Sequence, residues 1–406
     1  MAGRGHTNER AQDHPFGAVN PPIVRSSTFT YPTAAEGARR FAVAGGAEGE
    51  PGLFYSRMEN PTVRALEDHL AKLEGAEACI ATASGMGAVH CALMGLLKPG
   101  AKLVADPCVY GCTHTLIKKL KAWGVDVIEA DTSDPKSLER AIGSHVDVVF
   151  IETPMNPTLR LVDLQRAAQL AHKAGGLVVV DNTFCTPLGQ RPLDLGCDLV
   201  VHSLTKGVNG HSDLLAGAVM GKASLVAKAW DWRKDAGAIL DADTAWLCLR
   251  GAQTLKVRFE AAVASTMEIV GTLSAEGLKV SHPLLTGHPD YKVAQKQMAA
   301  GCSVFTLDLD SQSAAMRFLD RLQVFARAVS LGGYESLACH PASTTHSAMK
   351  EETRKKAGIT PGLVRLSVGI EGTDVLLADI LRALERRPVH KVDVRGKKAV
   401  AMTRKA

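Results

Sequence analysis

The chain has 406 residues, of which 46% are hydrophobic and 22% are charged, a balance typical of soluble globular proteins. This length exceeds what one compact core usually accommodates, so we expect two or more domains. No apolar run is long enough to span a membrane and the polar N-terminus lacks the core of a signal peptide, so we expect a cytoplasmic protein without a membrane partner.

The charge and the cysteines argue against a nucleic-acid-binding protein, a disulfide-linked protein and a metalloprotein. The net charge is +5, but five positive residues lie within 395–406, so we expect a basic, flexible tail over 389–406. Elsewhere basic and acidic residues alternate, which argues against a nucleic-acid partner. The nine cysteines lie mostly in apolar segments, as reduced core residues do. Cys108, Cys112 and His114 are close together, but no second ligand pair follows at zinc-site spacing, so we predict no metal.

The first elements are an arm and a helix. Residues 1–57 are rich in Pro, Gly and Ala without strong periodicity, which predicts an extended N-terminal arm. A helix is predicted within 60–77, because Pro61 suits a first turn and Gly75 a stop. Val63, Leu66 and Leu70 line one face of it.

Apolar runs and amphipathic segments then alternate as far as Gly221. Several runs are almost continuous Val and Ile, as in strands buried on both faces, and helical stretches such as 164–176 end in glycine. Such alternation predicts an α/β fold, with a mostly parallel seven-stranded sheet covered by helices on both faces, in a large domain over 58–244. The expected strands are 78–83, 102–106, 125–130, 146–152, 177–182, 198–203 and 215–221.

The pattern changes after about residue 245. Longer helices there alternate with isolated apolar strands, which predicts a smaller C-terminal α+β domain over 245–388. Strands are expected within 302–309, 325–331 and 362–369.

Several strands of the large sheet end in reactive or small residues. The first runs into Ser84-Gly85-Met86-Gly87 ahead of a helix, which suits an anion, although glycines also serve simply as turns. Another ends in Asp181, which could equally be a helix cap. The sixth ends in Ser203, followed by Thr205 and Lys206. In α/β sheets, ligands gather beyond these carboxyl ends.

The residues at these three strand ends could together bind the different chemical groups of one ligand. The glycine turn and the hydroxyls of Ser203 and Thr205 suit a phosphate, and Asp181 suits a basic nitrogen. Lys206 suits an aldehyde that an amine captures as a Schiff base. Pyridoxal phosphate has all three features, so we predict it as the cofactor.

At this point a family can be named. The chain resembles the cystathionine/methionine-metabolism family of pyridoxal-phosphate enzymes (fold type I) over nearly its whole length. The matching motifs are "YSRMENPT" (55–62), "ASGMGA" (83–88), "ETPMNP" (152–157), "VVVDNTF" (178–184), "VVHSLTK" (200–206) and "RLSVGIE" (365–371).

The resemblance implies roles for the cofactor-binding residues. Lys206 matches the lysine that forms the Schiff base and moves protons, and Asp181 matches the partner of the ring nitrogen. Asn156 matches a residue near the ring oxygen. The phosphate cradle is matched by Gly85, Met86, Ser203 and Thr205.

Further implied roles concern the ring and the neighbouring subunit. Tyr110 matches a tyrosine that stacks on the ring and assists protonation of the leaving group. Tyr55 and Arg57 match residues that reach the phosphate of a neighbouring subunit. The arm would therefore complete another site, in a homotetramer built from two active dimers.

The position of Arg365 in the sequence also predicts a role for it without the resemblance. Alternation along 362–369 places it inside an apolar strand, where an arginine needs an anionic partner. A substrate carboxylate held bidentately fits, and a structural ion pair is the alternative. In the family the matching arginine binds the amino-acid carboxylate, helped by a serine that matches Ser330.

Three positions favour one branch of the family. Cys112 matches a cysteine typical of members that cleave methionine. Members that cleave cystathionine typically carry glutamates where this chain has Phe54 and Val329. The resemblance therefore implies a carbon–sulfur lyase that converts L-methionine to methanethiol, 2-oxobutanoate and ammonia by γ-elimination, with Tyr110 and Cys112 assisting Lys206.

Other positions keep alternatives open. Gly333 stands where members that cleave methionine have an acidic residue, and Thr344 stands where methionine is more usual. Cleavage of cystathionine, or sulfhydrylation of O-acetyl- or O-succinylhomoserine, therefore remains an alternative. A non-catalytic binding protein would require the loss of Lys206, Asp181 or Arg365, and all three are present.

Overall fold

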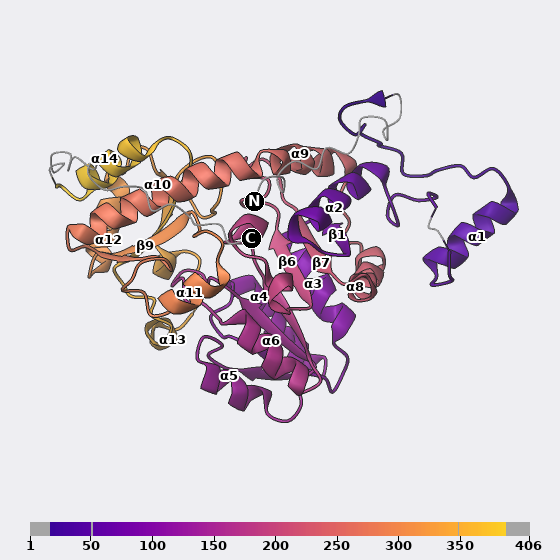
Figure 1. Ribbon diagram of the computed structural model, residues 1–406, viewed down its shortest axis with the longest axis horizontal. Helices are drawn as coiled ribbons and strands as arrows, with labels where there is room; N and C mark the ends of the chain where they lie inside the picture. Colours follow the sequence, from indigo (N-terminus) through magenta and orange to yellow (C-terminus); the bar gives the residue numbers. More distant parts are fainter. Residues whose placement is uncertain (1–16, 50–51, 348, 387–406) are drawn as a thin grey trace, which may run out of the picture.

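The computed structural model describes residues 17–49, 52–347 and 349–386. The predicted tail over 389–406 and the first sixteen residues of the predicted arm lie outside the described residues. Two sheets, each covered by helices, make up most of the described chain (Figure 1). In its described part, no helix combines the length and apolar character needed to cross a membrane.

The large sheet has seven strands in the order β1-β7-β6-β5-β4-β2-β3. Neighbouring strands from β6 to β3 run parallel, whereas β7 is antiparallel to both β6 and β1. The predicted mostly parallel sheet is therefore confirmed. Its strands are β1 (Ala78–Thr82), β2 (Lys102–Ala105), β3 (Asp126–Glu129), β4 (Val148–Glu152), β5 (Leu177–Asp181), β6 (Leu199–Ser203) and β7 (Gly217–Gly221).

The sheet is buried on both faces because alternate apolar residues point to opposite sides. Phe150 and Val179 pack with one set of helices, whereas Ile151 and Val180 pack with another. The first face is covered by α3 (Gly85–Leu96), α4 (Gly111–Ala122) and α8 (Ala223–Ala236). The other is covered by α2 (Pro61–Glu74), α5 (Pro135–Ile142), α6 (Leu164–Lys173) and α9 (Ala242–Gln253).

Helix α2 follows the predicted signals closely. The Asn60 side chain accepts a hydrogen bond from the Thr62 amide at 2.9 Å, and Pro61 occupies the first turn. Gly75 ends the helix at a φ of 76°, a left-handed conformation that favours glycine. The strand β1 that follows therefore starts at a defined place.

The smaller sheet has the order β10-β11-β12-β9-β8. Its strands are β8 (Lys279–Ser281), β9 (Val304–Asp308), β10 (Ala326–Arg327), β11 (Leu337–Cys339) and β12 (Leu363–Ser367). The associated helices are α10 (Leu255–Ala275), α11 (Tyr291–Gln297), α12 (Gln312–Arg321), α13 (Glu351–Lys356) and α14 (Thr373–Ala383). Short helices α7 (Thr186–Gly189), η3 (Pro192–Leu195) and η4 (Pro341–Ser343) lie in connections.

One local expectation was confirmed only in part and another was wrong. The strand expected within 325–331 is only two residues long, and the chain is irregular from Ala328 to Ser330. The arm is also not wholly extended, because residues 34–44 form helix α1 (Ala34–Ala44), which lies apart from the main body (Figure 1). Only Gly37 is buried in that helix, so the helix contributes little to the core.

The predicted domain limits stay predictions. The boundary between 244 and 245 falls inside α9, whose buried Ala245 and Leu249 share a core with Leu66 of α2. Helix α10 then runs from the large sheet to the smaller one, and Ile269 packs in the core of the latter. The two sheets are thus joined by continuous helical structure.

Candidate active site

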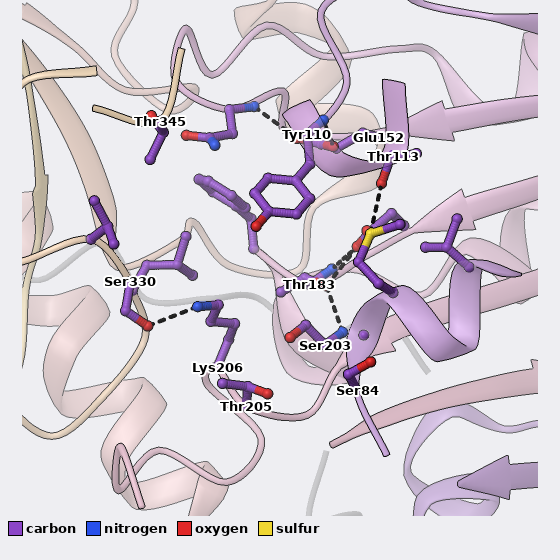
Figure 2. A pocket seen from close by; sticks show the side chains of 18 of the residues that line it. Ser84, Tyr110, Thr113, Glu152, Thr183, Ser203, Thr205, Lys206, Ser330 and Thr345 are labelled. Atoms are coloured by element: carbon purple, nitrogen blue, oxygen red, sulfur yellow. Dashed lines mark hydrogen bonds between the residues drawn. The ribbon is translucent and has the colours of Figure 1, made fainter. Parts of the chain in front are cut away.

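A cavity of about 270 Å³ lies beyond the carboxyl ends of β4, β5 and β6. Residues from the smaller sheet and its loops close its other side, so the cavity is formed where the two sheets face each other (Figure 2). Most of the predicted site residues line it, namely Gly85, Met86, Tyr110, Asn156, Asp181, Ser203, Thr205, Lys206, Val329, Ser330 and Arg365.

One end of the cavity can hold a phosphate. Helix α3 starts at Gly85, directly after the N-cap Ser84, so its first amides face this end. A Cβ atom added to Gly85 would lie 2.7 Å from Cβ of Ser203, so the absence of a side chain brings this backbone close to the serine. Thr205 lies nearby, with its hydroxyl accepting a hydrogen bond from the Ala216 amide at 3.1 Å.

Lys206 reaches into the middle of the cavity from the turn after β6. Its Nζ atom donates to Oγ of Ser330 at 2.8 Å, across the gap between the two sheets (Figure 2). Burial lowers the pKa of this amine, and the positive charge of Arg365 lowers it further. Both effects favour the neutral amine, which is the nucleophilic and basic form.

Asp181 ends β5, between β4 and β6. Its Oδ1 atom accepts hydrogen bonds from the Thr183 hydroxyl at 2.6 Å and from the Thr183 amide at 3.1 Å. The same hydroxyl accepts from the Ser203 amide at 2.9 Å, so Thr183 joins the aspartate to the phosphate end. Burial raises the pKa of Asp181, while the bonds from Thr183 act in the opposite direction.

Tyr110 borders the cavity at the start of α4, and 42% of the residue's surface is exposed. Burial of its hydroxyl raises the phenol pKa, and a hydrogen bond with Cys112 raises it further. The phenol is therefore held protonated and can donate. The Tyr110 amide donates to Oε2 of Glu152 at 2.7 Å, which ties the start of α4 to the end of β4 (Figure 2).

Arg365 lies in the middle of β12 with only 3% of its surface exposed. Its Nη1 atom donates to Oδ1 of Asn156 at 2.8 Å and its Nη2 atom to the carbonyl of Ser330 at 2.7 Å. Both partners are neutral, and its buried Nε has no hydrogen-bond partner. A buried guanidinium with neutral partners suits an anionic ligand, as predicted for a substrate carboxylate.

Four predicted site residues lie outside this cavity. Cys112 is exposed beside Tyr110, and Phe54 is buried against Phe41 with ring centroids 4.3 Å apart. Tyr55 is 41% exposed, and Arg57 donates to the Lys234 carbonyl at 2.7 Å. Whether the arm residues serve a neighbouring subunit stays a prediction.

Other residues that line the cavity were not singled out from the sequence. Glu152 could have been found by the rule that led to Asp181, because it is a carboxylate at the end of a buried strand. Leu215 and Thr345 carried no signal of this kind, since they come from loops whose path only the fold defines. The remaining lining residues are Val89, Thr113, Thr183, Phe184 and Leu331, together with Ser84 of the predicted anion-binding turn.

The cavity fits the predicted cofactor. Its glycine-lined helix start suits a phosphate, and Asp181 offers a carboxylate for a ring nitrogen. Lys206 offers an amine of lowered pKa for an aldehyde, and the Tyr110 ring borders the same space. Among the described residues, no cluster of three or more His, Cys, Asp or Glu side chains could hold a metal ion.

Comparison with known proteins agrees with this chemistry. Residues 5–385 match the model of the Cys/Met metabolism PLP-dependent enzyme family. The L-methionine gamma-lyase of Pseudomonas putida is 43% identical over 94% of this chain and 96% of its own length. The O-succinylhomoserine sulfhydrylase of Pseudomonas aeruginosa is 37% identical over 91% of this chain and 92% of its own length.

A solved structure gives the same fold. Cystathionine gamma synthase from Xanthomonas oryzae, in complex with aminoacrylate and cysteine, superposes with a TM-score of 0.88. It is 38% identical, and the match covers 94% of this chain and 97% of that one. The relatives therefore share one fold while their names describe different reactions at sulfur.

Proposed function

Because the chain belongs to the Cys/Met metabolism family of PLP-dependent enzymes, which act on carbon–sulfur bonds, we propose that it is an L-methionine γ-lyase. The reaction would consume L-methionine and water and release methanethiol, 2-oxobutanoate and ammonia. When bound, the cofactor supplies an aldehyde for an amine and a ring that withdraws electrons from the substrate Cα.

Lys206 is proposed as the base that takes a proton from Cα and then one from Cβ, so that the electron pair left at Cβ can expel the sulfur from Cγ. The lowered pKa of its amine supports this role, since a base must be partly neutral at working pH. Its side chain stands between Thr205 and Ser330, so it faces both the phosphate end and the carboxylate-binding side (Figure 2).

Tyr110 is proposed to protonate the departing sulfur. Its raised pKa keeps the phenol protonated at neutral pH, which an acid in this position requires. Cys112, whose side chain bonds to that phenol, would adjust its orientation and the adjoining substrate pocket.

Arg365 is proposed to hold the substrate carboxylate. Asn156 and the Ser330 carbonyl fix two of its nitrogens, so the guanidinium plane is set before substrate arrives. A fixed fork loses little entropy on binding and orients the substrate's Cα toward the base.

The observation that carries the choice of methionine is the apolar mouth of the cavity. Val329 and Leu215 both line it, and they are 56% and 67% exposed respectively. A thioether methyl can pack against these side chains, whereas the charged distal end of cystathionine would gain no partner from them. Val329 also stands where the resemblance places a glutamate in members that cleave cystathionine.

The deciding experiment compares three substrates with the purified, cofactor-loaded enzyme. The enzyme would be given methionine alone, cystathionine alone, or O-acetylhomoserine with sulfide. Release of the ketoacid would be measured with the first two, and formation of homocysteine with the third. We expect the highest kcat/KM with methionine. Faster release of ketoacid from cystathionine, or faster homocysteine formation, would refute the proposal.

We further propose that Tyr55 and Arg57 complete the site of a neighbouring subunit in a homotetramer of active dimers. Both lie outside this chain's own cavity, and Tyr55 is partly exposed. The test mixes the inactive variants Arg57→Ala and Lys206→Ala in equal amounts under conditions that let subunits exchange. About half of the dimers should then be hybrids, and each hybrid has one intact site of two. Activity should therefore recover to about a quarter of the wild-type value. No recovery in verified hybrids would contradict the shared site.

A further inference from the structure

Glu152 is a buried carboxylate that touches two separate parts of the candidate active site. It ends β4 with only 5% of its surface exposed, and it pairs in register with Asp181 on β5. Its two oxygens accept hydrogen bonds from two backbone amides. Oε2 accepts from Tyr110 at 2.7 Å and Oε1 accepts from Asn156 at 3.0 Å.

The first contact fixes the start of α4. Tyr110 is the N-cap residue of that helix, and the amide of an N-cap residue has no acceptor in the helical hydrogen-bond ladder. Glu152 satisfies this amide and thereby sets the position of the Tyr110 backbone. The direction of the phenol over the cavity depends on that position.

The second contact fixes the loop after β4. Asn156 lies in this loop, and its side-chain oxygen accepts from Arg365 at 2.8 Å. Arg365 in turn bonds to the Ser330 carbonyl, and the Ser330 hydroxyl accepts from Lys206. Hydrogen bonds therefore run from the tyrosine to the lysine around the cavity, and Glu152 joins the two halves of that path.

We propose that Glu152 is a positioning residue, which sets Tyr110 through one carboxylate oxygen and the Asn156–Arg365 pair through the other. This inference rests on the roles proposed above for Tyr110 and Arg365. It assigns Glu152 no contact with the reacting atoms, since both of its oxygens are occupied by backbone amides.

The electrostatics provide a specific signature of this role. Burial and the nearby charge of Asp181 raise the pKa of Glu152 to about 8, although its two amide contacts favour the ionised form. The charge of Glu152 also raises the pKa of the Tyr110 phenol, in addition to burial and Cys112. Removing that charge should therefore lower the phenol pKa, which a residue that only fills space would leave unchanged.

The test is Glu152→Gln, because glutamine keeps the shape but offers only one oxygen acceptor. We expect kcat/KM to fall roughly 10- to 100-fold, because one of the two buried amides loses its acceptor, with kcat lowered and KM raised. The phenol of Tyr110 should titrate at lower pH, measured as the ultraviolet difference between each protein and its Tyr110→Phe counterpart, with and without cofactor.

A matched control is available at the end of β3, the edge strand of the same sheet. Glu129 is also a carboxylate at a strand end, but it pairs with His114 outside the cavity. Glu129→Gln should keep wild-type kcat, KM and phenol titration. The proposal is overturned if Glu152→Gln shows the same behaviour as this control.

Two further measurements keep the result interpretable. If Glu152→Gln does not fold, Glu152→Asp keeps the charge but lacks one methylene, so it cannot reach both amides. Wild-type kcat and KM in that variant would also overturn the proposal. The phenol titration needs no turnover, so it tests Glu152 even if methionine proves not to be the substrate.

Discussion

The amine of Lys206 and the hydroxyl of Ser330 lie 2.8 Å apart although 124 residues separate them in the chain. Lys206 follows a strand of the large sheet, whereas Ser330 lies in the loop after β10 of the smaller sheet. Ser330 has a φ of 152°, which is unusual for a residue with a side chain, and its carbonyl holds Arg365. One strained residue thus contacts both the proposed base and the proposed carboxylate-binding group.

Replacing Ser330 by alanine should separate these two contacts. The carbonyl that holds Arg365 would remain, while the acceptor for Lys206 would be lost. We expect kcat/KM to fall roughly 3- to 10-fold, as for the loss of one ordinary hydrogen bond, with cofactor binding retained. Steady-state kinetics of Ser330→Ala would be compared with those of Ser347→Ala, an exposed serine whose hydroxyl donates to the Thr344 carbonyl. Equal kinetics in the two variants would contradict the assignment.

The lowered pKa of Lys206 predicts how stability varies with pH. The folded protein binds a proton at this amine less readily than the unfolded chain, whose lysine titrates near its ordinary pKa of about 10.4. The unfolded state therefore binds more protons between the two values, and stability should rise as pH increases through this window. At pH values below the pKa of Lys206 in the folded state, the buried amine is charged, and its burial lowers the free energy of unfolding by the full amount.

Lys206→Met isolates this effect because methionine has no charge at any pH. At neutral pH the cofactor-free variant should melt at a higher temperature than the cofactor-free wild type. The difference should narrow as pH rises toward 10, measured at one protein concentration. A difference independent of pH would show that burial does not shift this amine.

The cradle for the phosphate depends on the missing side chain of Gly85. In Gly85→Ala the new Cβ would lie 2.7 Å from Cβ of Ser203, so one of the two must move. We expect the dissociation constant for pyridoxal phosphate to rise about tenfold or more, measured by absorbance titration of the cofactor-free protein. Gly87→Ala is the control, since its Cβ would have no contact closer than 3.4 Å. Equal affinities in the two variants would refute this account.

Much of this site could be predicted from sequence because strand ends obey a simple rule. Parallel strands place their carboxyl ends at one edge, so Asp181, Ser203 and Lys206 could be brought together without coordinates. Arg365 could be predicted for a different reason, since a charged residue inside an apolar strand needs a partner. The family motifs then supplied the remaining roles.

The features that could not be predicted depend mainly on contacts between backbone segments that lie far apart in the sequence. Glu152 is significant because two amides converge on it, one 42 residues before it in the chain. The conformation of Ser330 arises where an expected strand stops early, which apolar alternation over 325–331 concealed. Helix α1 is only eleven residues long and lies in a segment rich in Ala, Gly and Pro, whose composition was interpreted as an extended arm.

Substrate choice should respond to charge at Val329, which is 56% exposed at the cavity mouth. Val329→Glu places a carboxylate where the distal ammonium of cystathionine would approach, while the methyl of methionine loses an apolar neighbour. We expect the ratio of kcat/KM for cystathionine to that for methionine to rise about tenfold, the effect of roughly 1.4 kcal/mol.

The neutral variant Val329→Gln separates charge from shape in that experiment. It should lose activity with methionine without gaining activity with cystathionine. The gain in Val329→Glu should also shrink at high salt, because an exposed pair is screened over about 10 Å at 0.1 M ionic strength. If glutamine produced the same gain, or if salt had no effect, the polarity or shape of the mouth and not its charge would govern which sulfur compound the enzyme accepts.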